Sequence, residues 1–408
     1  MIQNGQEKFN KKMLFVMHVD VIHPLIEFYN NSGDTVYFSA GASFFWNQNV
    51  TYILISELQK RLAENKTWVK DNFDIVIMME ACIFCEIYNT TMKEMGQLIK
   101  IFGVPTYVLG AGVHSPIDYS EEFLSKISDN AKYYVDSVLS SGGTITLRGN
   151  FTKHCLNILG YKDLFVTGCP SLYINGKNFS ISNQKVSIDT FRPMLSASKV
   201  QDINKKIYTK YPQSCYFDQD YYLKYMYHPE IIKNNKNIHP LFKKLYKQNR
   251  IFGYMNYIMW KRKILKSNFN FSYGSRIHGN IIALQQKIPA FVKIIDSRTR
   301  EIAEFYKIPN SIDIDYSEKN QDLYDLYKSL NYEEFNRNYL EKYNNFSKFL
   351  LDRDIPNNLG DSENFIEYLN GLNYYDLETD ESVQKIKERV CNNNLLYNLK
   401  NIINIKKH

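Results

Sequence analysis

Long apolar runs are missing from this chain. No apolar stretch reaches the roughly 18 residues that a membrane-spanning helix needs, and the run that follows Lys11 and Lys12 ends near Met17. A secretory signal peptide would have a longer apolar core, followed by small residues. The pattern predicts a strand at 13–18 and a cytoplasmic protein.

Cysteine is scarce, with six residues among 408. So few thiols do not form the disulfide framework of a small secreted domain. Cys82 and Cys85 have the spacing of a metal or redox pair, but their flanks are apolar and no second Cys/His pair lies at zinc-site distance. We expect both thiols, and Cys169, to be buried packing residues, and we expect no metal site.

A basic stripe that would bind nucleic acid is also absent. The formal net charge of +7 is mild, and no Lys/Arg run alternates with aromatic residues. Such a balance suits an anionic small molecule or an anionic membrane surface. We therefore expect no nucleic-acid partner. The apolar and basic stretch from Leu395 to Lys407 is either a solvated tail or a segment that docks peripherally on a membrane.

The chain has apolar residues enough for large cores, at 44% of the total, and its length suits two ordinary domains. Short apolar runs alternate with helix-like segments, which is typical of parallel sheets covered on both faces. Expected strands in the first half are 13–18, 73–79, 105–109 and 144–147, and expected helices are 52–65, 88–102 and 120–141.

A second, less regular alternation follows a turn-rich segment at 174–190 that is typical of a linker. From about residue 317 the apolar spacing fits one face of a helix. We expect an α/β protein with domains at 1–175 and 190–316 and a helical C-terminal extension at 317–408. Expected strands here are 194–196, 214–217, 269–272 and 290–295, and expected helices are 218–228, 241–263, 279–287 and 381–400.

The most informative segment is 272–301. Arg276 and His278 lie just before, or in the first turn of, an expected helix for which Ser275 is a candidate cap. Unpaired N–H groups of a first turn attract anions. A cation and an imidazole there predict an anion site with an acid or base beside it. The alternative is a surface arginine and a capping histidine that bind no ligand.

Further arginines follow other expected strands, and ligands of such sheets bind beyond the carboxyl ends of strands. Arg148 precedes Gly149, which allows close approach and suits anion binding; its alternative is a salt bridge to a neighbouring helix. Arg298 is placed to reach the same pocket. Arg300 fits equally well an ion pair on a helix from about 298 to 306.

Two loops carry weaker signals. Gly112 and His114 follow the strand at 105–109, but the loop lacks the G-x-G-x-x-G pattern of dinucleotide sites. Asn31 and Asp34 belong to a turn that its own residue types explain. Alone, neither loop indicates a function.

The block from Gly274 to Pro289, with its Arg276-Ile-His278-Gly motif, resembles the signature of the polysaccharide pyruvyl transferase family. In that family an Arg-x-His-Gly precedes a helix of small residues that ends before a proline. The turn at 31–34 resembles the family's N-terminal Asn-x-Gly-Asp. Further likeness lies at 147–152, 166–172 and 296–301, so that it covers roughly residues 14–310.

This resemblance implies two facing Rossmann-like domains with a cleft between them, the arrangement of GT-B glycosyltransferases. It implies transfer of the pyruvyl group of phosphoenolpyruvate to two hydroxyls of a sugar in a cell-surface polysaccharide or glycan. The products would be a cyclic ketal and phosphate, with no cofactor. The acceptor would be a saccharide or a lipid-linked saccharide on the side of the N-terminal domain, with the donor on the side of the second.

On this hypothesis Arg276, Arg148 and Arg298 hold the phosphate and the carboxylate of the donor. His278 protonates the enol carbon. Imidazole titrates at about 6.5, so that a modest local anionic charge would keep it protonated at pH 7. The proton of the sugar hydroxyl would pass to Asp34 or His114, which the sequence does not rank.

Two other function classes stay open. A nucleotide-sugar glycosyltransferase would share the two-domain fold and an arginine-lined phosphate site. A non-catalytic glycan-binding or assembly protein would keep the fold without turnover, although the intact pair of Arg276 and His278 argues against it. The expected location is the cytoplasm, with the inner face of the membrane as an additional place of contact.

Overall fold

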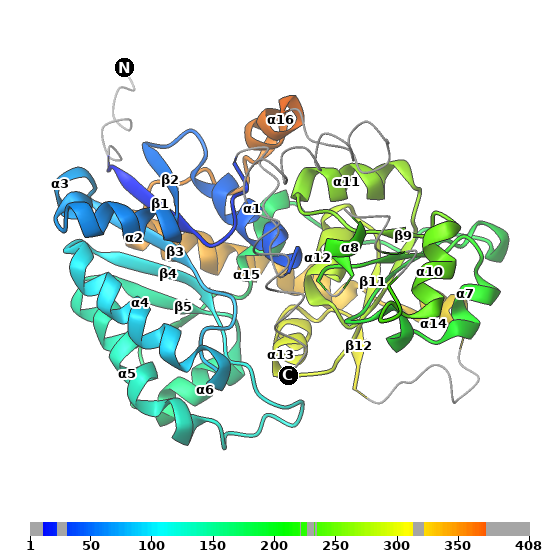
Figure 1. Cartoon of the computed structure of the whole chain (residues 1–408), viewed down its shortest axis with the longest axis horizontal. Helices are drawn as coiled ribbons and strands as arrows, with labels where there is room; N and C mark the ends of the chain where they lie inside the picture. The colour runs from blue at the N-terminus through cyan, green and yellow to red at the C-terminus, as the bar shows by residue number, and fades with distance from the viewer. Residues whose placement is uncertain are drawn as a thin grey trace.

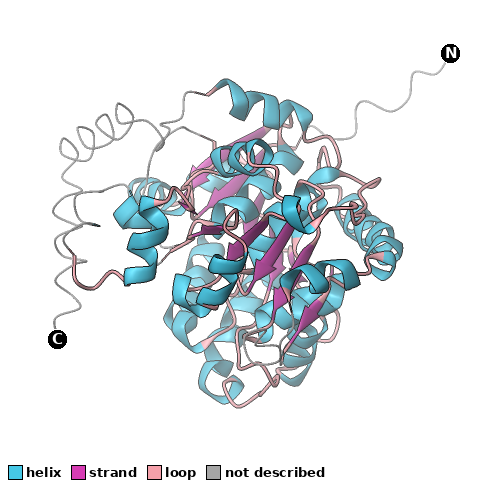
Figure 2. Ribbon diagram, turned by 90° about the vertical axis from the view of Figure 1, so that its right-hand side faces the viewer, coloured by secondary structure: helices cyan, strands magenta, loops and turns pink. Residues whose placement is uncertain are grey.

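The computed structural model describes residues 11–22, 31–220, 222–226, 232, 235–312 and 322–372. It contains two six-stranded parallel sheets, each covered by helices and each forming its own lobe (Figures 1 and 2). Helices near the C-terminus pack across both lobes. The expected α/β architecture, with two Rossmann-like sheets and a helical C-terminal region, is confirmed.

The first sheet has the strand order β2-β1-β3-β4-β5-β6. Every residue of β1 and of β3 is buried, as expected for parallel strands covered on both faces. The direction of strand addition reverses between β1 and β3, and such a switch point is where open α/β sheets bind ligands. The strands are β1 (Met13–Met17), β2 (Val50–Leu54), β3 (Ile75–Met79), β4 (Thr106–Ala111), β5 (Thr144–Leu147) and β6 (Phe165–Val166).

The second sheet has the order β12-β11-β10-β7-β8-β9. Counted from its own first strand, this is the 3-2-1-4-5-6 order of Rossmann folds, with the switch point between β7 and β10. Its strands are β7 (Pro193–Ser196), β8 (Cys215–Phe217), β9 (Ile251–Phe252), β10 (Phe271–Gly274), β11 (Ala290–Lys293) and β12 (Asn310–Ser311).

Helices on the first sheet include the packed pair α4 and α5, and α4 ends at Gly103, which adopts the left-handed conformation that favours glycine. The helices of this lobe are α1 (Gly33–Phe45), α2 (Ile55–Glu64), α3 (Trp68–Asn72), α4 (Asn89–Phe102), α5 (Leu124–Ser140) and α6 (Asn150–Ile158). Those of the second lobe are α7 (Lys205–Lys210), α8 (Leu223–Met226), α10 (Pro240–Lys247), α11 (Tyr257–Lys266), α12 (Ile277–Gln285) and α13 (Ser297–Tyr306).

Helix α1 lies between the two lobes and packs against α12 (Figure 1). Every residue of α1 except Asp34 is buried. A helix that is apolar on all sides has no amphipathic period, which is why only a turn was expected at this point of the sequence.

The C-terminal helices join the lobes. They are α14 (Leu323–Ser329), α15 (Glu333–Asp352) and α16 (Glu363–Gly371). On α15, the ring of Phe346 lies 5.7 Å from that of Phe44 on α1, and the ring of Phe349 lies 5.6 Å from that of Phe165 on β6. Just before α15, the Tyr332 hydroxyl donates to the carbonyl of Ala290 on β11 at 2.5 Å. The region is therefore part of the folded body.

Two of the expected helices contain a strand. The expected helix at 52–65 begins as strand β2, because residues 50–54 pair with β1. The expected helix at 241–263 is α10 and α11, separated by the short strand β9. The expected helix at 381–400 and the stretch from Leu395 to Lys407 lie outside the described residues. Within the described ranges, no helix is long and apolar enough to span a membrane.

Candidate active site

A cavity of about 320 Å³ lies between the two sheets. Its lining includes residues that directly follow β1, β3 and β10. Strands β1 and β3 form the first switch point and β10 is one of the two strands of the second, so the cavity is placed where each sheet by itself would bind a ligand. Side chains of both lobes therefore face one space.

Helix α12 brings Arg276 and His278 to this cavity, as the sequence predicted. Arg276 is the N-cap residue and His278 lies in the first turn. Ser275 lines the cavity but does not cap the helix, because the residue after it takes the N-cap position and no side-chain bond caps α12. The expected cap was wrong, and the first-turn N–H groups remain available to a ligand.

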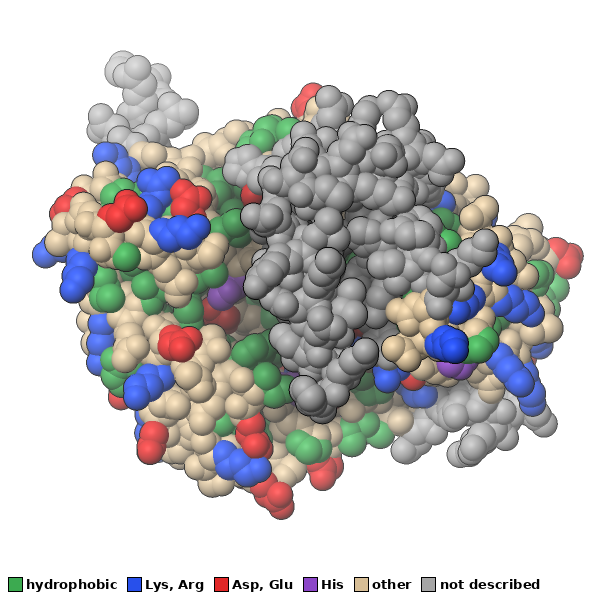
Figure 3. Space-filling view, in the orientation of Figure 1, with side chains coloured by type: hydrophobic (Ala, Val, Ile, Leu, Met, Phe, Trp, Pro, Cys, Tyr) green, Lys and Arg blue, Asp and Glu red, His purple; other side chains and the backbone are tan. Residues whose placement is uncertain are grey.

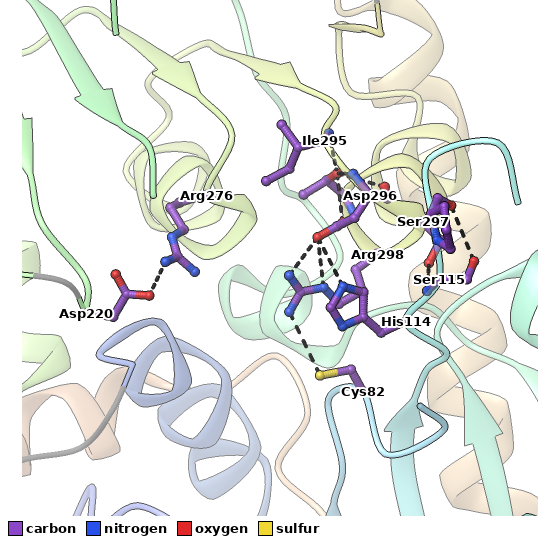
Figure 4. A network of polar contacts seen from close by, with 11 residues as sticks. Cys82, His114, Ser115, Asp220, Arg276, Ile295, Asp296, Ser297 and Arg298 are labelled. Carbon is purple, nitrogen blue, oxygen red and sulfur yellow. Dashed lines mark hydrogen bonds and ion pairs between the residues drawn. The ribbon is translucent and has the colours of Figure 1, made fainter. Parts of the chain in front are cut away.

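Arg276 contacts a carboxylate in the segment that follows strand β8. Its guanidinium forms an ion pair with Asp220 (Figure 4). The Nε atom of Arg276 is buried and has no hydrogen-bond partner among the residues that the structure describes. Part of the donor capacity of this arginine is therefore unused.

Arg298 lies in the first turn of α13 and forms a fork with Asp296, its Nη2 being 2.6 Å from Oδ2 (Figure 4). Its Nη1 lies 4.0 Å from Cys82 Sγ. Asp296 also caps α13, so that one carboxylate fixes both the start of the helix and the guanidinium of Arg298. Arg300 pairs instead with Glu304 at 2.8 Å, the ion pair on a helix face that was its alternative.

Arg148 follows β5 and is only 2% exposed. Its Nε and Nη2 atoms are buried and have no hydrogen-bond partner in the described ranges, and the residue lines the cavity. An ion pair with a helix, the alternative reading of Arg148, is not found in the part of the chain that the structure describes. Gly112 leaves room for this side chain, because a Cβ there would lie 3.2 Å from Arg148 Cδ and 2.9 Å from the carbonyl oxygen of Ala81.

The protonation of His278 differs from the prediction. Burial first, and then the charges of three arginines, lower its pKa from 6.5 to about 3. In the free protein the imidazole is therefore neutral at pH 7, because burial and the neighbouring cations both disfavour its charged form and outweigh any anionic charge that would keep it protonated. The three arginines are Arg148, Arg298 and Arg276.

Asn31 and Asp34 also line the cavity. Asn31 accepts a bond from the Gly33 N–H at 3.0 Å and donates one to Asp34 Oδ1 at 3.3 Å. Burial raises the pKa of Asp34 to about 6, against the opposing charge of His18 and the arginines. His114 is not among the lining residues; its Nε2 lies 3.7 Å from Asp296 Oδ2.

Sequence reasoning missed several side chains of the cavity. Glu80 directly follows the expected strand at 73–79, and His18 ends the expected strand at 13–18, which was a usable signal. Their side chains form a pair at 3.1 Å. Cys169 is buried as expected, but its Sγ lies 3.9 Å from His278 Nε2. Cys82 was expected to be buried and is instead half-buried in the lining of the cavity.

The cavity thus carries three arginines together with the carboxylates of Asp34 and Glu80, which suits an anionic ligand beside a hydroxyl-bearing one. Among the described residues, no group of three or more His, Cys, Asp or Glu side chains is arranged to hold a metal ion.

The model of one protein family, described as polysaccharide pyruvyl transferase, matches residues 31–297. The chain belongs to this family. The matched range includes Arg148, Arg276 and His278 and ends one residue before Arg298. Family membership makes the protein a transferase with a role in polysaccharide biosynthesis and a saccharide acceptor.

Solved structures show weaker likeness. An uncharacterized protein from Klebsiella pneumoniae is 14% identical, with 74% of this chain and 91% of its own covered at a TM-score of 0.39. A protein described as a UDP-N-acetylglucosamine 2-epimerase from Listeria monocytogenes is 10% identical, covering 81% and 90% at 0.42. MnaA from S. aureus, solved with UDP, is 12% identical, covering 96% and 97% at 0.36. Curated proteins give no match.

Proposed function

We propose that this pyruvyl transferase takes its pyruvyl group from phosphoenolpyruvate and attaches it to two hydroxyls of one sugar, forming a cyclic ketal and releasing phosphate. The acceptor is a saccharide or a lipid-linked saccharide of a cell-surface glycan. The reaction takes place in the cytoplasm or at the inner face of the membrane.

The observation that carries the donor assignment is the buried guanidinium of Arg148, whose Nε and Nη2 atoms have no hydrogen-bond partner among the described residues. A cation whose Nε and Nη2 atoms lack partners is costly to bury. A phosphate or carboxylate ligand would satisfy both atoms bidentately. Phosphoenolpyruvate carries both groups, and Arg276, Arg298 and the uncapped N-terminus of α12 surround the same cavity.

His278 is the proposed acid that protonates the methylene carbon of the donor. Because its pKa is about 3 in the free site, this role requires the donor's own negative charge. A bound trianion offsets the field of the three arginines and raises the pKa of the imidazole. The site then becomes acidic only when the donor is present.

Protonation of the methylene carbon makes its neighbour electrophilic. A first sugar hydroxyl forms a C–O bond there, the phosphate leaves with the electron pair of its C–O bond, and a second hydroxyl forms the other C–O bond. Of the two hydroxyl protons, one balances the third hydrogen of the new methyl group and the other leaves on phosphate. No oxidant or reductant is needed.

The test is incubation of the purified protein with phosphoenolpyruvate and a panel of glycans, followed by assay of phosphate and by mass spectrometry of the glycan. The proposal expects phosphate release matched by the mass gain of one pyruvyl ketal. Transfer from a nucleotide sugar, with none from phosphoenolpyruvate, would instead indicate a glycosyltransferase. Arg276→Lys should lose much of the activity because the planar fork is lost, whereas Arg300→Lys, away from the cavity lining, should not.

A further inference from the structure

One titratable pair of the cavity has no role in the donor chemistry. His18 directly follows β1 and Glu80 directly follows β3, which are adjacent parallel strands. The carboxyl ends of adjacent parallel strands lie together, so the two side chains meet, with His18 Nε2 lying 3.1 Å from Glu80 Oε1. The His18 side chain is 35% exposed and that of Glu80 is 9% exposed.

We propose that His18, held by Glu80, is the general base that takes the proton from the attacking hydroxyl of the sugar. This role rests on the proposed pyruvyl transfer. Glu80 is a positioning residue, since it acts through the imidazole.

The hydrogen bond to Glu80 leaves the Nδ1 atom of His18 available to accept a proton. Nε2–H donates to the Glu80 carboxylate, so that Nδ1 carries the free lone pair. Among the described residues, Nδ1 has no hydrogen-bond partner. The ring is steadied on its other side by Phe38 of α1, with ring centroids 5.9 Å apart. An oriented imidazole with one nitrogen on a carboxylate and the other facing a ligand is the arrangement of a proton acceptor.

The charged groups that face His18 are Glu80, from the end of β3, and Asp34, from the first turn of α1. Burial acts to lower the pKa of His18, but the two carboxylates outweigh it and the pKa is raised. His18 is therefore a stronger base than a free imidazole. In this it is the opposite of His278, whose pKa the arginines and burial depress.

The two bases expected from the sequence fit less well. Burial raises the pKa of Asp34 to about 6, but one of its oxygens already accepts from Asn31 Nδ2. His114 is not in the lining of the cavity, and burial followed by the charge of Arg298 lowers its pKa.

The pair also offers hydrogen-bond acceptors to a sugar. His18, Glu80 and Asp34 line the cavity from the first lobe, to which Arg148 also belongs. Carboxylates and a neutral imidazole accept hydrogen bonds from the hydroxyls of a sugar. In the space-filling view, histidine and acidic side chains are visible in the recess beside the first lobe (Figure 3).

The proton balance is complete. The first hydroxyl forms the C–O bond and its proton passes to His18 Nδ1, while His278 has given a proton to the methylene carbon. The phosphate leaves with the electron pair of the broken C–O bond, and the second hydroxyl forms the ketal. The protons of the two hydroxyls then restore His278 and protonate phosphate, and His18 returns to its neutral form.

The experiment compares His18→Gln and Glu80→Gln with the control His154→Gln. His154 lies on α6 and forms an exposed pair with Glu121, its Nε2 being 2.5 Å from Oε1. His18→Gln should lower kcat about 100-fold or more, with the Kd of phosphoenolpyruvate changed less than about three-fold. Glu80→Gln should shift the acid limb of the pH profile of kcat/KM to lower pH, because the carboxylate no longer raises the pKa of His18. The His154 variant should keep wild-type values.

The outcomes separate the two proposals. If the wild type transfers pyruvyl groups and His18→Gln keeps more than a third of the wild-type kcat, the role of His18 is overturned while the proposed function stands. An unchanged pH profile of kcat/KM in Glu80→Gln overturns the positioning role of Glu80. Direct binding of phosphoenolpyruvate verifies that each variant is folded. A wild-type protein that transfers no pyruvyl group to any acceptor overturns the proposed function and, with it, this role.

Discussion

The Glu301 carboxylate on α13 accepts two hydrogen bonds from Thr152 on α6, one from the backbone N–H at 2.6 Å and one from the hydroxyl at 2.8 Å. Helix α13 belongs to the second lobe and α6 to the first, so one side chain ties the lobes together. The contact is close, since a Cβ on Gly149 would lie 2.3 Å from Glu301 Cγ. Thr152 lies about one helical turn beyond Arg148 in the sequence, so this contact between the lobes stabilises that side of the cavity.

Glu301→Ala should lower the free energy of unfolding by about 2 kcal/mol or more, because both hydrogen bonds from Thr152 are lost and its buried N–H and hydroxyl are left without an acceptor. Urea unfolding followed by circular dichroism measures the change. The matched control is Glu304→Ala, which removes an exposed ion pair on the same helix and should cost less than about 0.5 kcal/mol. Equal effects in the two variants would argue against a stabilising contact between Glu301 and Thr152.

Arg148→Met should raise the Kd of phosphoenolpyruvate roughly 10- to 100-fold, the loss expected for hydrogen bonds to a charged group. The free protein should be as stable as the wild type or melt a few degrees higher, because an unpaired buried cation is replaced by an apolar chain of similar length. Calorimetric titration and a thermal melt test both halves. A melting temperature several degrees lower would mean that Arg148 is satisfied within the free protein.

Donor binding should be coupled to proton uptake by His278. Its pKa is about 3 in the free site, and a bound anion raises the pKa toward neutrality, so that protons are taken up and affinity increases as the pH falls. Titration calorimetry in buffers of different ionisation enthalpy counts the protons. In His278→Gln the uptake assigned to the imidazole should vanish; an identical proton count in both proteins would show that His278 stays neutral.

Gly33→Ala should lower kcat at least about 10-fold through displacement of His278. The added Cβ would lie 3.2 Å from His278 Cβ and 2.9 Å from Gln219 Oε1, and small misplacements of a catalytic group are costly. Gly371→Ala is the control, since nothing lies within 4 Å of a Cβ there. Full activity of Gly33→Ala would show that the imidazole position is not limiting.

The predicted elements that were correct are those with local signals. Strands β1, β3, β4 and β5 are short buried runs bounded by polar residues, glycine or proline, and α12 follows strand β10 after a short turn. The boundary between β2 and α2 was missed because residues 50–54 run into the helix without a glycine or proline, and only pairing with β1 decides that they are extended. Helix α1 was missed because burial on all faces removes the period that marks a helix.

By itself the sequence determined that Arg276 and His278 share the start of one helix, since neighbours along the chain must lie close together, and that Arg148 follows a strand. Only the tertiary structure decided what surrounds them. It brings His18 to Glu80 across 62 positions of sequence and leaves Nε and Nη2 of Arg148 without a hydrogen-bond partner among the described residues. It also buries His278 among arginines, so that the imidazole expected to be charged is neutral. A pKa depends on desolvation and on charges from every neighbouring element, and those neighbours are chosen by the fold.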